Sequence, residues 1–529
     1  MILYLYKKKY IMTKLLLILS LSIILFSCQQ NRGLLPSEVQ IALDSAKTNK
    51  TELQKVIAHY KNDSLKLKAA YFLIANMEDH CYYKAKIVDT SGQNVDFRVL
   101  DYPSYDVMRE AWDSLETKIG TIDFKRDTVI FDLQLLSADY LINNIDLAFT
   151  AWRNPWAKNL SFDEFCEYIL PYRSSNEPIE DWRSQFVDRY TWLKDSMKNP
   201  NDPIEAAILI NQEIKSWYKF DPLFYRHPTD LGLSEMFKYK RGRCEDMTNL
   251  AIYAMRSQGI PVMGDYTPAW PNTGNNHAWN ATLDKDKKVV IFMGGLDDPY
   301  VYQLNNKKAK VYRKTFSKQQ NSLAEIAPNF EALPGWLASA YYKDVTTDYI
   351  EPGNVTVELK EEQPDSVSFA YLAVFNSGDW KAIHWGKIKD KNADFSAMGT
   401  DIVYWPCFYK NKELIEANKP FLLDENSEIS YFIPDTNKLV DLTLYSTTKR
   451  TIVKTTDEIE KASFKDSTAY ILQYWDKEWI VVDTVMSKQN KGLHFLNVPS
   501  NALYWLVEKD SRKEERIFSN DSEGHLHWW

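Results

Sequence analysis

The chain has few cysteines, and they stand far apart. Five occur among 529 residues, at positions 28, 81, 166, 244 and 407, with no Cys-x-x-Cys pair and no cluster at zinc-ligand spacing. This distribution excludes a disulfide-stapled scaffold and predicts neither a metal site nor a cofactor. Cys81, Cys166 and Cys407 stand beside aromatic residues, so we interpret them as small buried hydrophobic side chains.

Basic residues are not in excess either. The sequence has 64 Lys and Arg against 72 Asp and Glu, a formal net charge of −8, and no basic run beyond its first residues. A chain of this charge is a poor match to a phosphate backbone, so nucleic acid is excluded as a partner.

Long apolar runs are missing except for one near the N-terminus. Residues 15–26 are apolar apart from two serines and follow a basic stretch that includes Lys7 and Lys14. Twelve residues are too few to cross a bilayer, so this segment predicts a secretory signal. Its ending, Leu25-Phe26-Ser27-Cys28, is similar to a bacterial lipobox, which implies cleavage before Cys28 and lipidation of its thiol.

A cleaved leader of this kind predicts where in the cell the protein is located. Cleavage leaves 60 basic and 72 acidic residues, a net charge of −12. The lipid on Cys28 is then the expected membrane attachment. We expect a lipid-anchored protein of the cell envelope, in the outer membrane and facing either the periplasm or the surface.

The chain is too long for a single core. Apolar residues at helical spacing in 37–60, 64–77 and 105–119, and a capping box at Ser161 to Glu164, predict a helical N-terminal region. We expect a multidomain protein. Its predicted segments are the signal 1–27, a tether 28–36, a mostly helical domain 37–200, an α+β core 201–346, and two β modules at 347–455 and 456–529.

The two C-terminal modules are predicted from an internal repeat. The stretch from Ala370-Tyr371-Leu372 to Trp380 matches the stretch from Ala469-Tyr470-Ile471 to Trp479 at an offset of 99, and 395–405 matches 495–505 at an offset of 100. A nearly constant offset favours tandem copies of one β-sandwich-like unit, with hairpin tips at 376–379 and 476–478. Their tryptophans and tyrosines are interpreted as core; stacking on sugars is the alternative.

Two short segments contain candidate catalytic residues. Gly242-Arg243-Cys244-Glu245-Asp246 places a cysteine at the start of a predicted helix, 245–258, and Asn276-His277-Ala278-Trp279-Asn280 places a histidine on a predicted strand. A thiol needs a base to become a nucleophile at neutral pH, and a helix N-terminus lowers its pKa. The pattern therefore indicates a Cys244–His277 pair, and Asn280 is expected to face away from it.

These segments, with Gly259-Ile260-Pro261, resemble the transglutaminase-like core, a papain-related fold, over roughly residues 200–315. The resemblance implies Cys244 as nucleophile, His277 as base, and an orienting acid about sixteen residues after the histidine. That count reaches Met293, which cannot serve, so Asp297 and Asp298 are the candidates. The Cys244 amide, with Trp217 or Tyr218, is expected to hold the oxyanion, and Trp270 and Trp279 to flank the cleft.

The flanks also resemble large Bacteroidetes lipoproteins with such a core, at Trp152-Arg153, in 171–183 and in 310–316. Two functions follow from these observations. The first is a lipid-anchored thiol enzyme that acts on amide bonds of a peptide, protein or glycoconjugate. Hydrolysis is expected rather than crosslinking, because no calcium loop is present. The second is a weakened or inactive binding or scaffold protein for peptide or glycan, which the methionine at the acid position favours.

Overall fold

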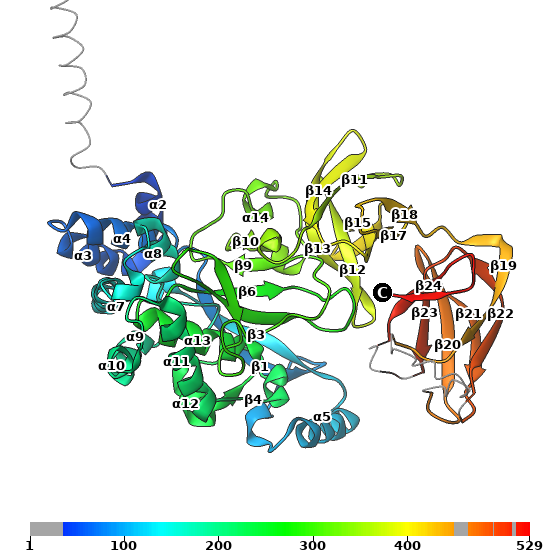
Figure 1. Cartoon of the computed structure of the whole chain (residues 1–529), viewed down its shortest axis with the longest axis horizontal. Helices are drawn as coiled ribbons and strands as arrows, with labels where there is room; N and C mark the ends of the chain where they lie inside the picture. The colour runs from blue at the N-terminus through cyan, green and yellow to red at the C-terminus, as the bar shows by residue number, and fades with distance from the viewer. Residues whose placement is uncertain (1–34, 449–463, 490, 510, 512–514) are drawn as a thin grey trace, which may run out of the picture. The chain divides into compact units, whose positions relative to one another are not determined.

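The computed structural model describes residues 35–448, 464–489, 491–509, 511 and 515–529 (Figure 1). The predicted signal segment 1–27 and the lipidation site Cys28 lie outside these residues. The chain divides into two compact units: the described residues up to His80 together with Phe131–Leu141, and Cys81–Ile130 with Ile142–Trp529. Within the described ranges, no helix combines the length and the apolar character needed to cross a bilayer.

The first unit is helical. Its helices are α2 (Ser37–Ser45), α3 (Lys50–His59), α4 (Ser64–Ala75) and α6 (Asp132–Leu135). The helical pattern over 37–60 is broken after Ser45, because Lys47 has a φ of 51°, in the left-handed region that a continuous helix excludes. The side-chain amide of Asn49 then donates to the carbonyls of Leu133 and Leu136, which ties α3 to α6.

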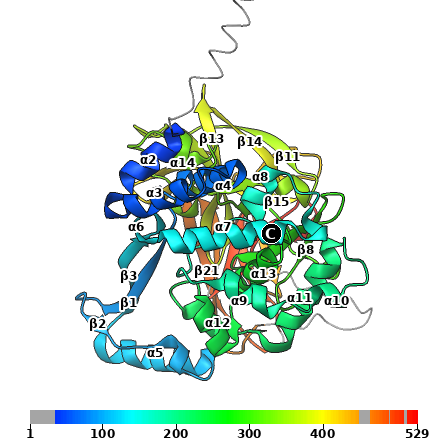
Figure 2. The same ribbon diagram turned by 90° about the vertical axis from the view of Figure 1, so that its left-hand side faces the viewer.

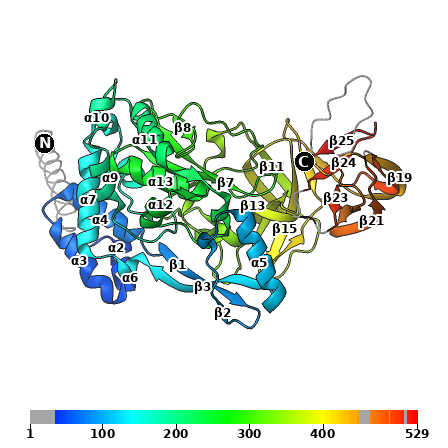
Figure 3. The same ribbon diagram turned by 90° about the horizontal axis from the view of Figure 1, so that it is seen from below.

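The region from 81 to 200 contains a sheet as well as helices. A three-stranded antiparallel sheet in the order β2-β1-β3 stands where helix was expected, while the capping box at Ser161 opens a helix as predicted. Figure 3 shows β1 and β3 side by side. The elements are β1 (Cys81–Asp89), β2 (Asn94–Val95), α5 (Tyr105–Ile119), β3 (Ile122–Phe131), α7 (Ala138–Trp152), α8 (Phe162–Tyr168), α9 (Trp182–Arg189) and α10 (Leu193–Ser196).

The α+β core has a central helix against a five-stranded antiparallel sheet. Helix α13 (Cys244–Ser257) contacts α9, α11 (Pro203–Trp217) and α12 (Leu233–Tyr239) on its other sides, as Figure 2 shows. The sheet has the order β10-β9-β6-β7-β8. Its strands are β6 (Val262–Thr267), β7 (His277–Leu283), β8 (Val289–Phe292), β9 (Tyr312–Lys314) and β10 (Tyr342–Asp344), and the smaller elements are β4 (Lys219–Phe220), β5 (Arg241–Gly242) and α14 (Leu323–Ile326).

The C-terminal region contains two β modules, each built from antiparallel sheets. The second includes a strand before the predicted boundary at 455/456, because β19 pairs with β22. The strands of the first module are β11 (Gly353–Glu358), β12 (Phe369–Asn376), β13 (Asp379–Lys389), β14 (Asn392–Met398), β15 (Ile402–Lys410), β16 (Glu413–Glu416), β17 (Phe421–Leu423) and β18 (Ile429–Tyr431). The strands of the second are β19 (Asp435–Leu444), β20 (Ala469–Asp476), β21 (Glu478–Met486), β22 (Leu493–Ser500), β23 (Tyr504–Glu508), β24 (Ile517–Asn520) and β25 (Leu526–Trp528).

The modules repeat in topology as well as in sequence. The strand order β13-β12-β15-β17-β18 corresponds to β21-β20-β23-β24-β25, and the pair β11–β14 to β19–β22. Both have the same irregularity, a register shift after Leu372 and after Leu472. A buried tyrosine in each donates to a carbonyl five residues earlier, Tyr404 to Gly399 and Tyr504 to Pro499 at 2.5 Å. The offset of 100 therefore marks equivalent positions in space.

Candidate active site

Cys244 is the first residue of α13, and the turn before it fits only glycine. A Cβ on Gly242 would lie 2.3 Å from the Tyr218 hydroxyl and 2.7 Å from the Asp246 Cβ. The Asp246 carboxylate accepts from the N–H groups of Arg243 and Leu231, at 3.0 Å each, and so caps the helix. The predicted helix start is confirmed, since α13 begins at Cys244.

His277 opens strand β7, opposite Thr267 of β6. Its Nε2 lies 2.8 Å from the hydroxyl of Tyr302. The ring contacts two indoles, with centroid distances of 6.2 Å to Trp270 and 5.8 Å to Trp279, and the two indoles stack on each other at 6.3 Å. In the tautomer in which Nε2–H donates to the Tyr302 oxygen, Nδ1 is the nitrogen that can take a proton from another group.

The surroundings of the Cys244 sulfur connect the two segments. The backbone N–H of Ala278, the residue after His277, and the hydroxyl of Tyr225 both lie within hydrogen-bonding reach of the sulfur. The start of α13 and the start of β7 therefore meet at the thiol. The side chain of Cys244 is buried, with 5% of its surface exposed.

The electrostatics differ from the expected thiolate–imidazolium pair. Burial, and secondarily Glu245, raises the pKa of the Cys244 thiol above its ordinary value, against the smaller effects of the Ala278 N–H, Arg243 and Tyr225. Burial also lowers the pKa of His277, although Glu245 opposes this. Lys314 pairs with Glu245 at 2.5 Å. These shifts keep both groups neutral at pH 7. The lowered thiol pKa predicted from the helix N-terminus is wrong, because burial and Glu245 outweigh the Ala278 N–H, Arg243 and Tyr225.

The two predicted acids occupy different positions. Asp298 accepts from the side-chain amides of Asn211 and Gln212, at 2.8 and 3.0 Å, and so joins α11 to the turn after β8. Asp297 bridges to Met293 through its backbone, and its charge acts on Tyr302. Across the described residues, neither carboxylate hydrogen-bonds to His277. Strand β8 ends at Phe292, before it reaches the level of His277, so no strand residue faces the ring from that side.

The predicted oxyanion and cleft residues lie deeper than expected. Tyr218 and Trp279 are fully buried, and the Trp279 indole donates to the hydroxyl of Tyr349 at 2.9 Å. Trp217 packs against Phe237 and the guanidinium of Arg189. In the portion of the chain that is described, no hydrogen bond or ring contact joins these three side chains to Cys244. Asn280 faces α13 and donates to the carbonyl of Thr248.

A cavity of about 410 Å³ opens beside His277. Tyr225, Trp270, Tyr302 and the loop 273–276 contribute to its wall. Asn376, at the end of β12, holds this loop by donating its side-chain amide to the carbonyls of Trp270, Thr273 and Asn275, at 2.8 to 3.0 Å. The first β module therefore helps to position the backbone that precedes the histidine.

Sequence reasoning did not identify Tyr225 or Tyr302. The chain contains 32 tyrosines, so residue type alone marks neither of them. Tyr225 lies in the 3-10 segment Pro222–Arg226, within a loop notable for Asp, Pro and Tyr. Tyr302 lies in an irregular stretch, whose position depends on contacts far away in the sequence.

Comparison with known proteins agrees with this core. Residues 190–292 match the Transglutaminase-like superfamily. Similar solved structures include a candidate cysteine protease from Cytophaga hutchinsonii, at 12% identity, a TM-score of 0.20 and coverage of 35% of this chain and 64% of that one. They also include red sea bream transglutaminase, at 10% identity, a TM-score of 0.21 and coverage of 62% and 71%.

These matches are partial. The chain spans less than two thirds of the length of the Cytophaga protein, and no curated protein matches it. Residues 190–292 are nevertheless a transglutaminase-like domain, and Cys244 and His277 both lie within it.

Proposed function

We propose that the protein is a lipid-anchored thiol enzyme of the cell envelope that hydrolyses amide bonds in peptides, proteins or glycoconjugates. The observation that carries this proposal is the meeting of the Cys244 sulfur with the Ala278 N–H, one residue after His277. A cysteine at a helix N-terminus beside a histidine is the arrangement of a nucleophile and its base. The location in the cell envelope and the lipid anchor at Cys28 are predicted from the sequence alone.

The reaction starts from neutral partners. His277 takes the thiol proton as the sulfur attacks the carbonyl carbon, and the oxyanion that forms is held by the Cys244 N–H and the Tyr225 hydroxyl. His277 then gives the proton to the leaving amine, and a thioester remains on Cys244. Water attacks this thioester, with His277 again as base, and releases a carboxylic acid and the free thiol.

Acyl-enzyme trapping tests this proposal. The full chain is incubated with a library of peptidyl aminocoumarin amides, and coumarin release and intact mass are measured. We expect a single acyl adduct on Cys244 and a loss of release of at least about 1,000-fold in Cys244→Ala, because the variant lacks the nucleophile. The matched control is Cys81→Ala, whose thiol lies in β1. Undiminished release in Cys244→Ala would rule out a thioester mechanism.

Tyr302→Phe tests how the imidazole is held. The Tyr302 hydroxyl contacts His277 Nε2, in the place where an acid was expected, and burial raises its own pKa so that it stays protonated. Removing it is expected to lower kcat about fivefold with little change in KM, since one hydrogen bond of about 1 kcal/mol is lost. Tyr300→Phe is the matched control, because that side chain is 68% exposed. Equal rates in both variants would show that Tyr302 does not orient the base.

The alternative is a binding or scaffold protein for peptide or glycan. The raised pKa of Cys244 and its burial favour this function. It predicts that no library member is turned over, while peptides still protect Cys244 from iodoacetamide. The trapping experiment therefore separates the two.

A further inference from the structure

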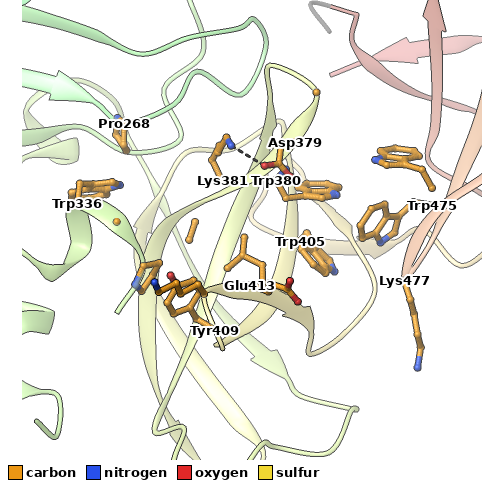
Figure 4. Close-up of a pocket in the computed structure, with 17 residues that line it drawn as sticks. Pro268, Trp336, Asp379, Trp380, Lys381, Trp405, Tyr409, Glu413, Trp475 and Lys477 are labelled. Carbon is orange, nitrogen blue, oxygen red and sulfur yellow. Dashed lines mark hydrogen bonds and ion pairs between the residues drawn. The ribbon is translucent and has the colours of Figure 1, made fainter. Parts of the chain in front are cut away.

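A second cavity, of about 610 Å³, lies where the two β modules meet the α+β core (Figure 4). Its wall is largely aromatic and combines side chains from all three parts. The aromatic residues are Trp336 of the core, Trp380, Trp405 and Tyr409 of the first module, and Trp475 and Trp479 of the second. This volume is within the range of about 300–1,000 Å³ typical of small-molecule sites.

The module repeat explains why these rings gather here. Trp380 and Trp479 are equivalent residues at the starts of β13 and β21, and Trp475 is equivalent to Phe375. The same aromatic surface of each module therefore faces the other. Trp380, Trp405 and Trp475 contact one another with centroid distances of 5.0 to 5.5 Å.

Three indole N–H groups in this wall have no acceptor. Trp380, Trp405 and Trp475 are each at least 94% buried, and none of their Nε1 atoms finds a hydrogen-bond partner in the described part of the chain. More than nine in ten buried polar groups are paired in folded proteins, so these rings pack at some cost. Their Nε1 atoms are closed to solvent, so a ligand in the cavity would contact instead the half-buried rings of Trp336, Tyr409 and Trp479.

The charged groups at the cavity restrict which ligand fits. The lining contains three lysines, Lys381, Lys412 and Lys477, and two acids, Asp379 and Glu413. Lys381 already pairs with Asp379 at 2.8 Å, as the dashed line in Figure 4 shows. Lys477 pairs with Glu361 at 3.0 Å, so the charges at the cavity balance. A balanced lining favours a neutral ligand over a quaternary ammonium or a basic peptide, although aromatic rings alone would suit a cation.

We propose that this cavity binds a neutral saccharide. A pyranose ring has C–H faces that pack on aromatic rings, and its hydroxyl or acetamido oxygens accept from ammonium groups such as that of Lys412. Glu413 offers an acceptor for sugar hydroxyls, while Trp336, Tyr409 and Trp479 offer ring surface at the cavity. The site is separate from Cys244 and does not depend on the thiol chemistry proposed above.

Titration of the full chain with neutral trisaccharides tests the site. The probes are triacetylchitotriose, cellotriose and maltotriose, followed by tryptophan fluorescence and by calorimetry. We expect at least one to bind saturably with a Kd of about 1 mM or tighter. Trp336→Ala and Trp479→Ala remove half-buried ring surface at the cavity, so each is expected to weaken that binding about five- to tenfold.

Matched variants keep the test decisive. Trp385→Phe, also on β13 but outside the cavity wall, is expected to bind like the original chain. Glu413→Gln, on the exposed start of β16, tests the polar side of the site without a change in the core. No saturable binding of any trisaccharide, binding that none of the three cavity variants weakens, or stronger binding of tetramethylammonium or of a peptide at these tryptophans would overturn the proposal. Survival of saccharide binding in Cys244→Ala is expected.

Discussion

His277→Ala is expected to slow acyl transfer to Cys244 by about 100- to 10,000-fold, the usual contribution of a general base. The expected loss is large because burial raises the pKa of Cys244. The thiol is therefore protonated in the resting protein and cannot attack without a base. A cysteine that is already ionised would tolerate the loss of its histidine far better. Single-turnover coumarin release gives the rate.

The pKa of His277 decides in which direction the rate of acyl transfer changes with pH. Only neutral His277 can accept the thiol proton, and burial lowers its pKa below the ordinary value of 6.5. Activity should therefore be complete at pH 7 and fall as the pH drops through this lowered pKa, with a midpoint below 6.5. His277→Ala should remove this loss of activity at low pH. Titration of His277 is expected to cause no change in activity above pH 6.5.

A control histidine makes the comparison specific. His494 lies on β22 of the second module, and its ring contacts Thr443. His494→Ala should keep both the rate and the pH profile. If His277→Ala retains activity within a factor of about ten, general base catalysis by this residue is wrong.

Local patterns predicted the elements that carry the candidate site. The helix that begins at Cys244 and the strand that begins at His277 follow from apolar periodicity and from a glycine turn, and Gly242 is close-packed against Tyr218 and Asp246. These signals are local, so a sequence contains them in full. The offset of 100 likewise predicted two modules, because a repeated sequence folds into repeated strand pairings.

What the sequence did not reveal depends on tertiary packing. Tyr302 contacts His277 from an irregular segment that follows β7 and β8, 25 residues later in the chain, and no periodicity marks such a contact. The pKa of Cys244 was predicted with the wrong sign because the helix N-terminus is visible in the sequence and the burial is not. Strand β3 was missed because it is largely exposed and carries charged residues, so it lacks an apolar alternation.

Below the candidate site, one buried ion pair connects three strands with the segment that follows them. Arg313 of β9 binds Asp265 of β6 through two hydrogen bonds of 2.7 Å, and both side chains are almost fully buried. The hydroxyl of Tyr349 also donates to Asp265, at 2.6 Å, and accepts from the indole of Trp279 on β7. Trp279 packs on the ring of His277, so the chain of contacts ends at the candidate base.

Arg313→Met is expected to lower the free energy of unfolding by about 3–5 kcal/mol, because it leaves the Asp265 carboxylate buried without its counter-charge. Urea denaturation followed by circular dichroism measures the change. Arg109→Met removes a more exposed arginine that pairs with Asp113 on α5, and its effect should stay below about 1 kcal/mol.

The double variant Asp265→Asn/Arg313→Met identifies the cause of that loss. It removes the stranded charge while keeping an oxygen that can accept from Tyr349, so it should recover a substantial part of the stability lost in Arg313→Met. A double variant as unstable as Arg313→Met, or less stable, would mean that the arginine contributes mainly through packing of its side chain. Recovery would show that the charge pair itself is what fixes β6, β7 and β9 beneath His277.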